Sequence, residues 1–482
     1  MYIIGRCNSR AESARLQSHH EGLDVEALLK GAAADGRLHA QEQRTNAYDF
    51  DVLVIGGGPG GSTASTLLAR RGWRVTMLER DRHPRFHIGE SLLPANMPIF
   101  EEIGALDKLR ALGRLKLGAD FPRDDGSYYT FKFDRALGDT PHYSFHVLRE
   151  ELDQMLFEHA RENGVDAREG AKVESVGFGD DGVTAQVNDN GATRTLRVRY
   201  LVDASGRDTF LGKQLKLVKR SEQHQSAALF AHYRDVAFNQ GDDEGNIISV
   251  YRFEHGWAWF IPLPSGEMSI GCVCKPEYLK QRRGMDNGEF MAKTLAMIPT
   301  AQSRLANAQR VSGVRVTGNY SYACTRMCGP RWIMIGDAWA FLDPIFSSGV
   351  FLTMHGAQHA FDVVDGSLRE PKRERALQRA FVRRMRAGYA RFAWFIYRFN
   401  SPVMKALFAD PRNVWRVEEG VVSMLAGDVF DDKRVLLRLK IFKFIYAVGS
   451  LINLRRWWAD LHERRRQNRM AFNDGNTPAD AV

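Results

Sequence analysis

A glycine-rich turn near the start of the chain has the residues required to bind a dinucleotide. Gly56, Gly58 and Gly61 follow the apolar run DVLVI and precede STASTLLARRG, and Glu79 ends the next apolar run. Such glycines let the backbone approach a pyrophosphate, the following helix offers free N–H groups, and the acidic residue can bind a ribose hydroxyl. The segment therefore predicts a strand, a turn, a helix and a second strand that bind a dinucleotide.

A second copy of the same glycine spacing is a control for the first. Gly177, Gly179 and Gly182 lie in VESVGFGDDGVTAQVN, where apolar residues alternate on both sides of Asp-Asp-Gly. This pattern predicts a β-hairpin and lacks the strand-turn-helix context of a nucleotide site. Only the first copy therefore predicts dinucleotide binding.

Two tryptophans stand one residue apart in HGWAWFIP, at residues 255–262. A Pro-Ser-Gly turn follows them, so we expect a hairpin whose first strand carries Trp257 and Trp259 on one face. From the spacing alone, a core strand with two large residues is the simpler interpretation. Their role therefore depends on the rest of the chain.

The composition is that of a globular protein large enough to enclose a cofactor. The chain has 482 residues, 44% apolar and 26% charged, and a chain of this length buries about three quarters of its unfolded surface. The five cysteines lack zinc-site spacing, and the N-terminus lacks the apolar core of a signal peptide. We expect a cytoplasmic protein with no metal site and no nucleic-acid partner.

The excess positive charge is concentrated near the C-terminus. The net charge is +9, and residues 431–470 contain eleven Lys or Arg against four Asp or Glu. Basic and apolar residues alternate there, so this tail, which includes Arg464, Arg465 and Arg466, either docks on an anionic membrane or an acidic carrier protein, or packs as a helix with a solvated basic edge. Only docking on an anionic membrane would make the protein peripheral to a membrane.

Four further segments resemble the flavoprotein family of aromatic-hydroxylating monooxygenases, geranylgeranyl reductases and flavin-dependent halogenases. They are FHIGESLLP (86–94), VLREELDQML (147–156), LVDASGRDT (201–209) and WIMIGDAWAFLDPIFSSGV (332–350). The resemblance implies FAD as the cofactor. The residues that it implies as FAD contacts, beside the glycine turn and Glu79, are Arg80, Ser91, Arg149, Asp337 and Gly349. From the residues alone, Asp337 could instead cap a helix and Arg149 could pair with Asp153.

The order W-x-W-x-I-P resembles the motif by which flavin-dependent halogenases are recognised. A companion motif, F-x-x-P-x-x-S-x-G, is present as Phe341, Pro344, Ser347 and Gly349. The resemblance implies that reduced FAD, O2 and halide give hypohalous acid. The tryptophans would then form an apolar wall between flavin and substrate, and halide would lie against the N–H groups of Ser348 and Gly349.

The resemblance also implies a lysine that carries the oxidant, either as a chloramine or by hydrogen-bonding hypohalous acid. Lys116 precedes LGADF on a predicted alternating strand, in the K-x-x-A-x-F pattern of that family, and Lys132 is the rival nearby. Desolvation lowers the pKa of a lysine towards neutrality, which suits either task.

One departure from the family pattern concerns the substrate. Tryptophan halogenases carry a glutamate directly before the residue equivalent to Ser347, and this chain has Phe346 there. An apolar residue resembles the branch that acts on phenols, free or bound to a carrier protein. No second nucleotide motif is found, so a separate flavin reductase is expected to supply reduced FAD.

These inferences predict an α/β fold of the aromatic-hydroxylase and halogenase type with an interleaved mixed sheet. We expect a loosely ordered extension at 1–47, an FAD-binding fold at 48–370 and a helical region with the basic tail at 371–482. The substrate sheet would come from about 110–145 and 210–310. An aromatic hydroxylase and a membrane-associated, non-halogenating flavoprotein such as a reductase remain the alternatives.

Overall fold

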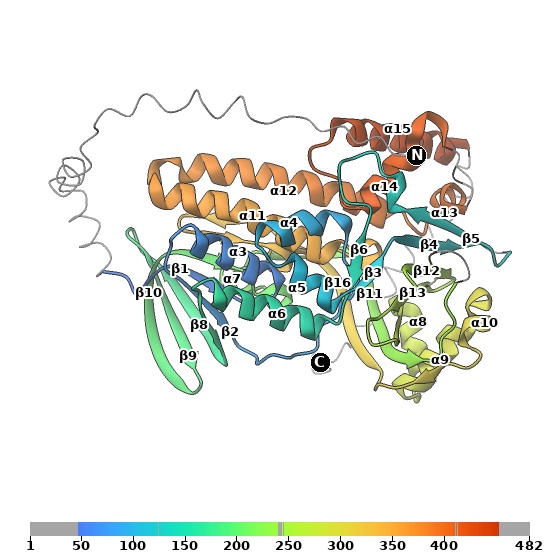
Figure 1. The fold of residues 1–482 in the computed structure, drawn as a ribbon, viewed down its shortest axis with the longest axis horizontal. Coiled ribbons are helices and arrows are strands. Elements are labelled where there is room, and N and C mark those ends of the chain that lie inside the picture. The colour runs from blue at the N-terminus through green and yellow to red at the C-terminus, as the bar shows by residue number, and fades with distance from the viewer. Residues whose placement is uncertain are drawn as a thin grey trace, which may run out of the picture. The chain divides into compact units, whose positions relative to one another are not determined.

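Parallel strands form the sheet that carries the predicted dinucleotide turn (Figure 1). The computed structural model describes residues 47–452, except 124, 240–242, 244, 410 and 412. The parallel strands lie in the order β18–β10–β1–β2–β7, with β17 antiparallel to β18 and the β8–β9 ribbon antiparallel to β10. The strands are β1 (Phe50–Ile55), β2 (Val75–Glu79), β7 (Asp166–Glu169), β8 (Ala171–Phe178), β9 (Val183–Asp189), β10 (Ala192–Asp203), β17 (Cys328–Gly329) and β18 (Trp332–Met334). The buried, continuously apolar β1 and β2 are typical of parallel strands covered on both faces.

Both glycine motifs adopt the structures predicted for them. Gly56, Gly58 and Gly61 lie between β1 and helix α3 (Pro59–Arg70), and Glu79 ends β2. The second copy forms the hairpin of β8 and β9. The same glycine spacing thus serves two unrelated turns.

A second, nine-stranded sheet carries the two tryptophans. Its order is β19–β16–β11–β14–β13–β12–β4–β5, with β15 on β11, and it is antiparallel apart from the β12–β4 pair. The strands are β4 (Gly118–Pro122), β5 (Tyr128–Lys132), β11 (Val218–Arg234), β12 (Ile247–Phe253), β13 (Gly256–Pro262), β14 (Met268–Cys274), β15 (Gln309–Arg310), β16 (Arg315–Cys324) and β19 (Ala340–Phe341). The predicted hairpin after Trp259 is confirmed as β13 and β14.

Lys116 lies in a third, two-stranded ribbon of β3 (Arg114–Lys116) and β6 (Ser144–His146). The predicted single strand through Lys116 and LGADF is wrong, because β3 ends at Lys116 and Gly118 begins β4. The Leu117 N–H donates to the Asn246 carbonyl oxygen at 2.8 Å, so from Leu117 onward the chain pairs alongside β12 and no longer with β6. A Cβ on Gly118 would lie 2.5 Å from the Phe131 carbonyl oxygen, so glycine permits this close approach.

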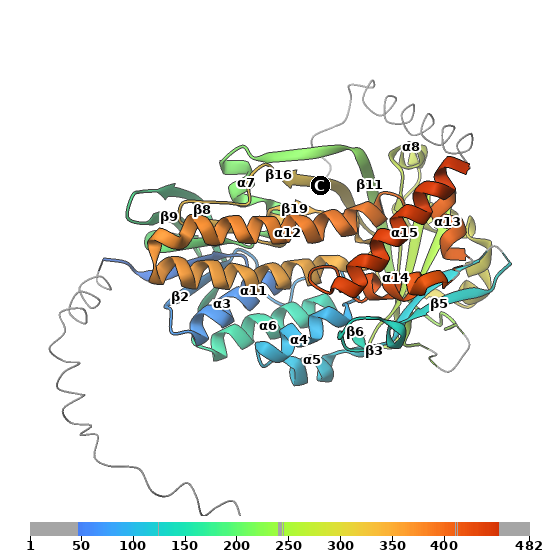
Figure 2. The ribbon, with the colours of Figure 1, turned by 90° about the horizontal axis from the view of Figure 1, so that it is seen from above.

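Helices cover the first sheet and form the C-terminal region. Helices α11 and α12 lie side by side (Figures 1 and 2). The helices are α4 (Met97–Glu102), α5 (Leu106–Leu112), α6 (Arg149–Glu162), α7 (Phe210–Gln214), α8 (Pro276–Leu279), α9 (Asn287–Ala296), α10 (Gln302–Leu305), α11 (Ser348–Arg369), α12 (Glu374–Ile396), α13 (Pro402–Ala409), α14 (Val417–Leu425) and α15 (Lys433–Ile452). Among the described helices, none is long and apolar enough to cross a membrane.

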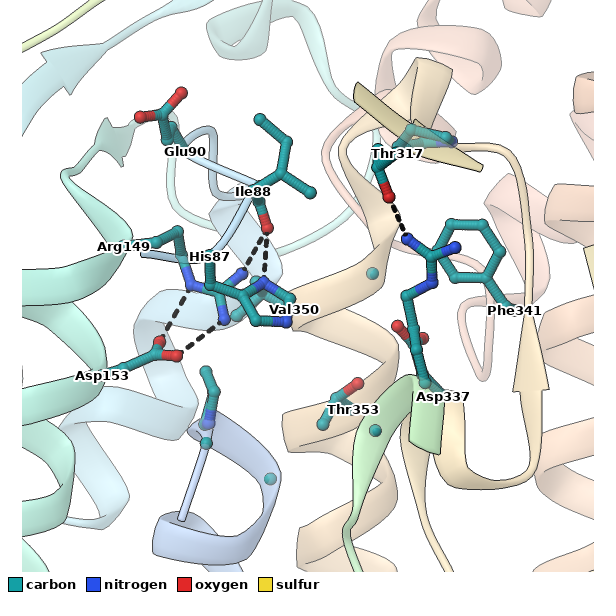
Figure 3. A pocket seen from close by; sticks show the side chains of 18 of the residues that line it. His87, Ile88, Glu90, Arg149, Asp153, Thr317, Asp337, Phe341, Val350 and Thr353 are labelled. Atoms are coloured by element: carbon teal, nitrogen blue, oxygen red, sulfur yellow. Dashed lines mark hydrogen bonds and ion pairs between the residues drawn. The ribbon is translucent and has the colours of Figure 1, made fainter. Parts of the chain in front are cut away.

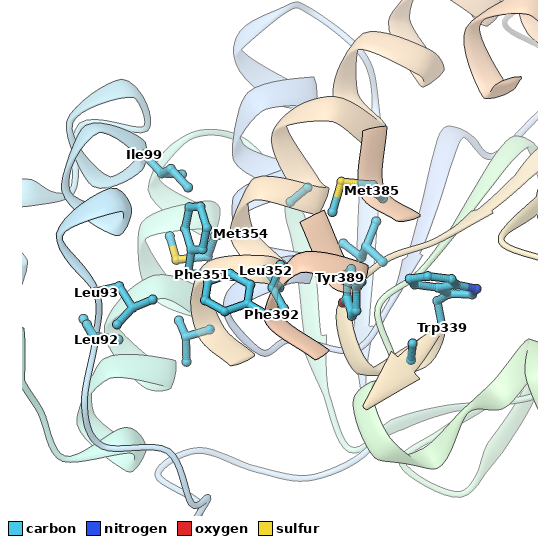
Figure 4. Close-up of a cluster of buried hydrophobic side chains, with 14 of the residues drawn as sticks. Leu92, Leu93, Ile99, Trp339, Phe351, Leu352, Met354, Met385, Tyr389 and Phe392 are labelled. Atoms are coloured by element: carbon cyan, nitrogen blue, oxygen red, sulfur yellow. The ribbon is translucent and has the colours of Figure 1, made fainter. Parts of the chain in front are cut away.

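One apolar core ties α11 to the segment that precedes α4. Figure 4 shows Phe351 and Met354 of α11 between Leu93 and Ile99 on one side and Phe392 of α12 on the other. All five side chains are buried. The N-terminus of α11, which carries the second halogenase-like motif, is thereby fixed by packing. The predicted domain boundaries stay a prediction, and residues 1–46 lie outside the described part.

The two glycine motifs give a matched pair of variants. A Cβ at Gly61 would lie 1.9 Å from the Gly56 carbonyl oxygen, whereas a Cβ at Gly177 has no heavy atom within 4 Å. We therefore expect Gly61→Ala to lower the free energy of unfolding by about 3 kcal/mol, as overpacking does, and Gly177→Ala to change it by less than about 0.5 kcal/mol. Denaturant unfolding of both variants checks this. Equal effects would show that α3 does not depend on this close approach.

Candidate active site

A cavity of about 410 Å³ lies at the carboxyl ends of β1, β2 and β10. This edge of a parallel sheet is where nucleotides bind in α/β folds. The predicted site residues that line the cavity are Gly58, Glu79, Arg80, Ser91, Arg149, Trp257, Trp259, Asp337, Ser347 and Gly349. Residues far apart in the sequence are thus brought to one site.

Glu79 holds the glycine turn in place. Its carboxylate accepts hydrogen bonds from the Gly57 N–H at 2.8 Å and the Asp81 N–H at 3.0 Å, and it pairs with Arg85 at 3.2 Å. Gly58 caps α3 and faces the cavity, since a Cβ there would approach only the Arg85 guanidinium, at 3.9 Å. Arg80 beside them is half-exposed and pairs with Asp208 at 2.5 Å.

Arg149 makes a bidentate ion pair and lines the cavity at the same time (Figure 3). It donates to the two carboxylate oxygens of Asp153 at 2.9 and 3.0 Å, and to the Ile88 carbonyl oxygen at 2.9 Å. Burial alone would raise the pKa of Asp153, but the Arg149 guanidinium holds it below its ordinary value. Arg149 therefore pairs with Asp153 and also belongs to the residues that line the cavity.

Asp337 faces the same cavity across from Arg149 (Figure 3). Burial raises its pKa to about 6, although the charges of Arg207 and Arg149 oppose the rise. Asp337 lies inside a short 3-10 turn, and the next long helix, α11, has Ser347 as its cap. The alternative that Asp337 caps a helix is therefore wrong.

The N-terminus of α11 points its first N–H groups towards the cavity edge. Ser347 has a left-handed backbone (φ 56°), and α11 begins at Ser348. The first N–H groups of a helix have no partner within the helix, and they favour an anion. Gly349 lines the cavity, whereas the Ser348 side chain is buried and lies outside the lining.

The tryptophans form one side of the cavity. Their ring centroids are 5.7 Å apart, which confirms that Trp257 and Trp259 share a face of β13. The Trp259 Nε1–H donates to Ser269 Oγ at 3.1 Å. A Cβ at Gly271 would lie 2.1 Å from the Trp259 ring, so the neighbouring strand leaves room for this indole.

Lys116 lines a second, smaller cavity of about 10 Å³, with room for about one water molecule. Its side chain is 2% exposed and Nζ donates to the Leu92 carbonyl oxygen at 2.8 Å. Burial lowers the pKa of Lys116 to about 7. The side chain of the rival Lys132 is 42% exposed and pairs with Asp243.

A short segment separates the two cavities. Ile345 and Ser347 line both of them, and Ile248 of β12 does so from the sheet. Phe346 lies on the Lys116 side, where its ring packs edge-on against Phe399 at 5.5 Å. Residues 345–347 therefore form a wall with the larger cavity on one side and Lys116 on the other.

Comparisons with known proteins identify the family of this chain. A family model described as an FAD binding domain matches residues 49–379. The flavin-dependent halogenase gsfI of Penicillium aethiopicum is 33% identical over 414 residues, which cover 80% of this chain and 75% of that protein. The chain belongs to the flavin-dependent halogenases. Such halogenases are FAD-dependent enzymes.

Solved structures of halogenases share the fold. CmlS, a flavin-dependent halogenase, superposes with a TM-score of 0.71 at 28% identity and covers 83% of this chain and 72% of its own. The flavin-dependent brominase Bmp2 gives a TM-score of 0.71 at 26% identity, with 82% and 98% covered. The predicted mixed α/β halogenase fold is confirmed.

The larger cavity of this halogenase fits FAD. It combines the glycine turn, the acidic end of β2 and the free N–H groups of α11, and a Cβ at Gly349 would meet no heavy atom within 4 Å. Among the described residues, no group of His, Cys, Asp or Glu is placed to hold a metal ion.

Asp343 lines neither cavity but contacts residues that do, and the sequence did not indicate this role. It lies between Phe341 and Pro344 of the second motif and accepts a hydrogen bond from the Ile345 N–H at 3.3 Å. Burial raises its pKa to about 7, while hydrogen bonds from Ile345, from the Trp257 side chain and from Ser226 lower it. Asp343 thus joins the tryptophan strand to the wall. Its place inside the motif was the available signal.

The variant Gly58→Ala should weaken FAD binding and leave the stability of the fold nearly unchanged. We expect FAD affinity to fall by about tenfold or more, because a Cβ would occupy the space through which a pyrophosphate approaches the backbone. The free energy of unfolding should change by less than about 0.5 kcal/mol, since no close contact is created. Flavin titration and denaturant unfolding measure the two. Undiminished flavin binding would place the pyrophosphate elsewhere.

The difference in the free energy of unfolding between Lys116→Met and the wild type should depend on pH. Below pH 7 the folded and unfolded states both bind the proton, and the wild type bears the full cost of a buried ammonium. From about pH 7 to 10.5, only the unfolded state stays protonated, so the cost declines as pH rises. We expect Lys116→Met to be more stable than wild type by roughly 3 to 5 kcal/mol at about pH 6, and by much less near pH 10. A pH-independent difference would contradict the lowered pKa.

Proposed function

We propose that this halogenase delivers oxidised halogen through Lys116 to a phenolic aromatic substrate, free or bound to a carrier protein. The observation that carries the proposal is a buried lysine in a cavity separated from the FAD site by residues 345–347. Bound reduced FAD would supply, with O2 and halide, hypohalous acid. The chain's own residues would then direct that oxidant.

Each side of the wall has its own task. Trp257 and Trp259 exclude the organic substrate from the flavin side, so that oxygen is not transferred to it. The N–H groups of Ser348 and Gly349 bind halide at the start of α11. On the other side, Lys116 accepts hypohalous acid or holds it by a hydrogen bond, in surroundings where its lowered pKa suits both.

The substrate class follows from the apolar Lys116 cavity. Phe121, Phe133 and Phe346 line it together with Leu425. A phenol is activated by losing its own proton, so it needs no carboxylate at position 346. The cavity of about 10 Å³ must widen to admit a ring.

The carrier-bound form of the substrate has support from a relative. The 1H-pyrrole-2-carbonyl-[peptidyl-carrier protein] chlorinase of Pseudomonas fluorescens is 28% identical over 84% of this chain. A relative named tryptophan 2-halogenase, from Chondromyces crocatus, is 36% identical over 64% of it. The position of Phe346 favours a phenol over an indole. Reduced FAD would come from a separate flavin reductase.

Docking through the basic tail stays a prediction. Arg464, Arg465 and Arg466 lie outside the described residues. The described part, α15, carries five Lys or Arg and exposes Phe444 and Leu451, which suits a carrier protein or a membrane surface.

Lys116→Ala should separate oxidant formation from halogenation. With reduced FAD, O2 and bromide supplied, we expect hypohalous acid, trapped by a scavenger dye, to form at the wild-type rate, while product falls by about a hundredfold because no group delivers the oxidant. Mass spectrometry of free and carrier-bound phenols, with tryptophan included, measures the halide-dependent mass shift. Lys132→Ala is the matched control.

Product formation at the wild-type level in Lys116→Ala would contradict delivery by this lysine. Halogenation of tryptophan alone would contradict the phenolic assignment, and a halide-independent oxygenated product would favour the aromatic hydroxylase.

A further inference from the structure

Three buried polar side chains lie beside Lys116, two of them in the β3–β6 ribbon and one on the segment next to β6. Ser144 is directly opposite Lys116, and His146 is opposite Arg114. Ser91 forms an antiparallel bridge with His146. Residues directly opposite each other, and residues two apart on a strand, share a face. The side chains of Arg114, Lys116, Ser144, His146 and Ser91 therefore lie on one side of the ribbon.

The side chains of Ser91, Ser144 and His146 are buried, and the described part of the chain offers their polar atoms no hydrogen-bond partner. Ser144 and His146 are 0% exposed, and Ser91 is 4% exposed. Among the described residues, nothing pairs with the hydroxyls of Ser91 and Ser144 or with either ring nitrogen of His146. Buried polar atoms are nearly always hydrogen-bonded to protein or to ordered water. Four unpaired atoms in one place point to ordered water as their ligand.

The side chains of Ser91, His146, Ser144 and Lys116 form a polar row that has one end at each cavity. Ser91 lines the FAD cavity, and Lys116 lines the smaller one. Burial, followed by the charges of Lys116 and Arg114, lowers the pKa of His146 well below its ordinary value. Its imidazole is thus neutral, with one nitrogen that donates and one that accepts. A neutral imidazole suits a chain of water molecules.

We propose that His146 is a positioning residue for Lys116 and that, with Ser144 and Ser91, it holds ordered water against Nζ. This rests on the proposed role of Lys116 as the carrier of the oxidant. The water fixes the direction of the amine and gives its protons a path.

The path through the water accounts for the protons that move in the chloramine route. The N–halogen bond forms as the O–halogen bond of hypohalous acid breaks, and one amine proton passes through the water to the departing hydroxide, which leaves as water. Transfer of the halogen to the ring then returns the ring proton to the amine. Hypohalous acid is the only oxidant required.

The test compares His146→Leu with His146→Gln and Ser144→Ala, and uses His159→Gln as the control. His159 is also buried, but its Nε2 bonds the Ile103 carbonyl oxygen at 2.7 Å, away from the ribbon. The readout is halogenated product per hypohalous acid trapped, over a range of pH. We expect His146→Leu to lower this ratio by about tenfold, which is what an unmade buried hydrogen bond costs.

Oxidant formation and FAD content should stay at the wild-type level in His146→Leu. The pH at which the ratio changes should move to lower values, because the loss of polar partners destabilises the protonated amine of Lys116 and lowers its pKa. His146→Gln should recover most of the ratio, and Ser144→Ala should lie between the two. A wild-type ratio and pH profile in His146→Leu would overturn the proposal, as would equal losses in His159→Gln.

A high-resolution crystal structure of the wild type tests for the proposed water without any measurement of activity. We expect ordered water within hydrogen-bonding distance of His146 and Ser144 Oγ, and a dry ribbon would overturn the proposal even if His146→Leu fails to fold. Should Lys116→Ala keep full product formation while the water is present, the proposed function fails and the water site stands.

Discussion

The burial of Lys116 is the constraint on which the rest of the site depends. An ammonium placed in an apolar cavity is costly, and a hydrogen bond to the Leu92 carbonyl oxygen does not replace its hydration. The pKa of Lys116 falls to about 7 as a result. Buried groups with strongly shifted pKa values are concentrated at functional sites, which is why this lysine, rather than the exposed Lys132, is the residue to which a function is assigned.

The separation of the two cavities depends on how the wall is fixed. Residues 345–347 are positioned from three directions: by the left-handed turn at Ser347, by the α11 core around Phe351, and by Asp343. Asp343 bonds the Trp257 side chain, so the strand of the tryptophans and the start of α11 hold each other. The two motifs are therefore parts of one structure, although the sequence shows them as separate patterns.

Local patterns were sufficient to predict the parts of the site that lie on single elements. The turn at Gly56 and the hairpin after Trp259 each follow from a few adjacent residues, and the structure confirms them. The strand through Lys116 was mispredicted because its end is decided by Asn246, a distant partner. The contact of Asp343 with Trp257 and the polar row at His146 also depend on pairings that no local pattern encodes.

In the proposed mechanism, oxidised halogen crosses between the cavities while the substrate ring does not. This can be tested by a single turnover with ¹⁸O₂, bromide, reduced FAD and a phenol that the enzyme halogenates. We expect a brominated phenol that carries no ¹⁸O, because the ring never reaches the flavin side of residues 345–347. A phenol with an ¹⁸O-labelled hydroxyl group would contradict it.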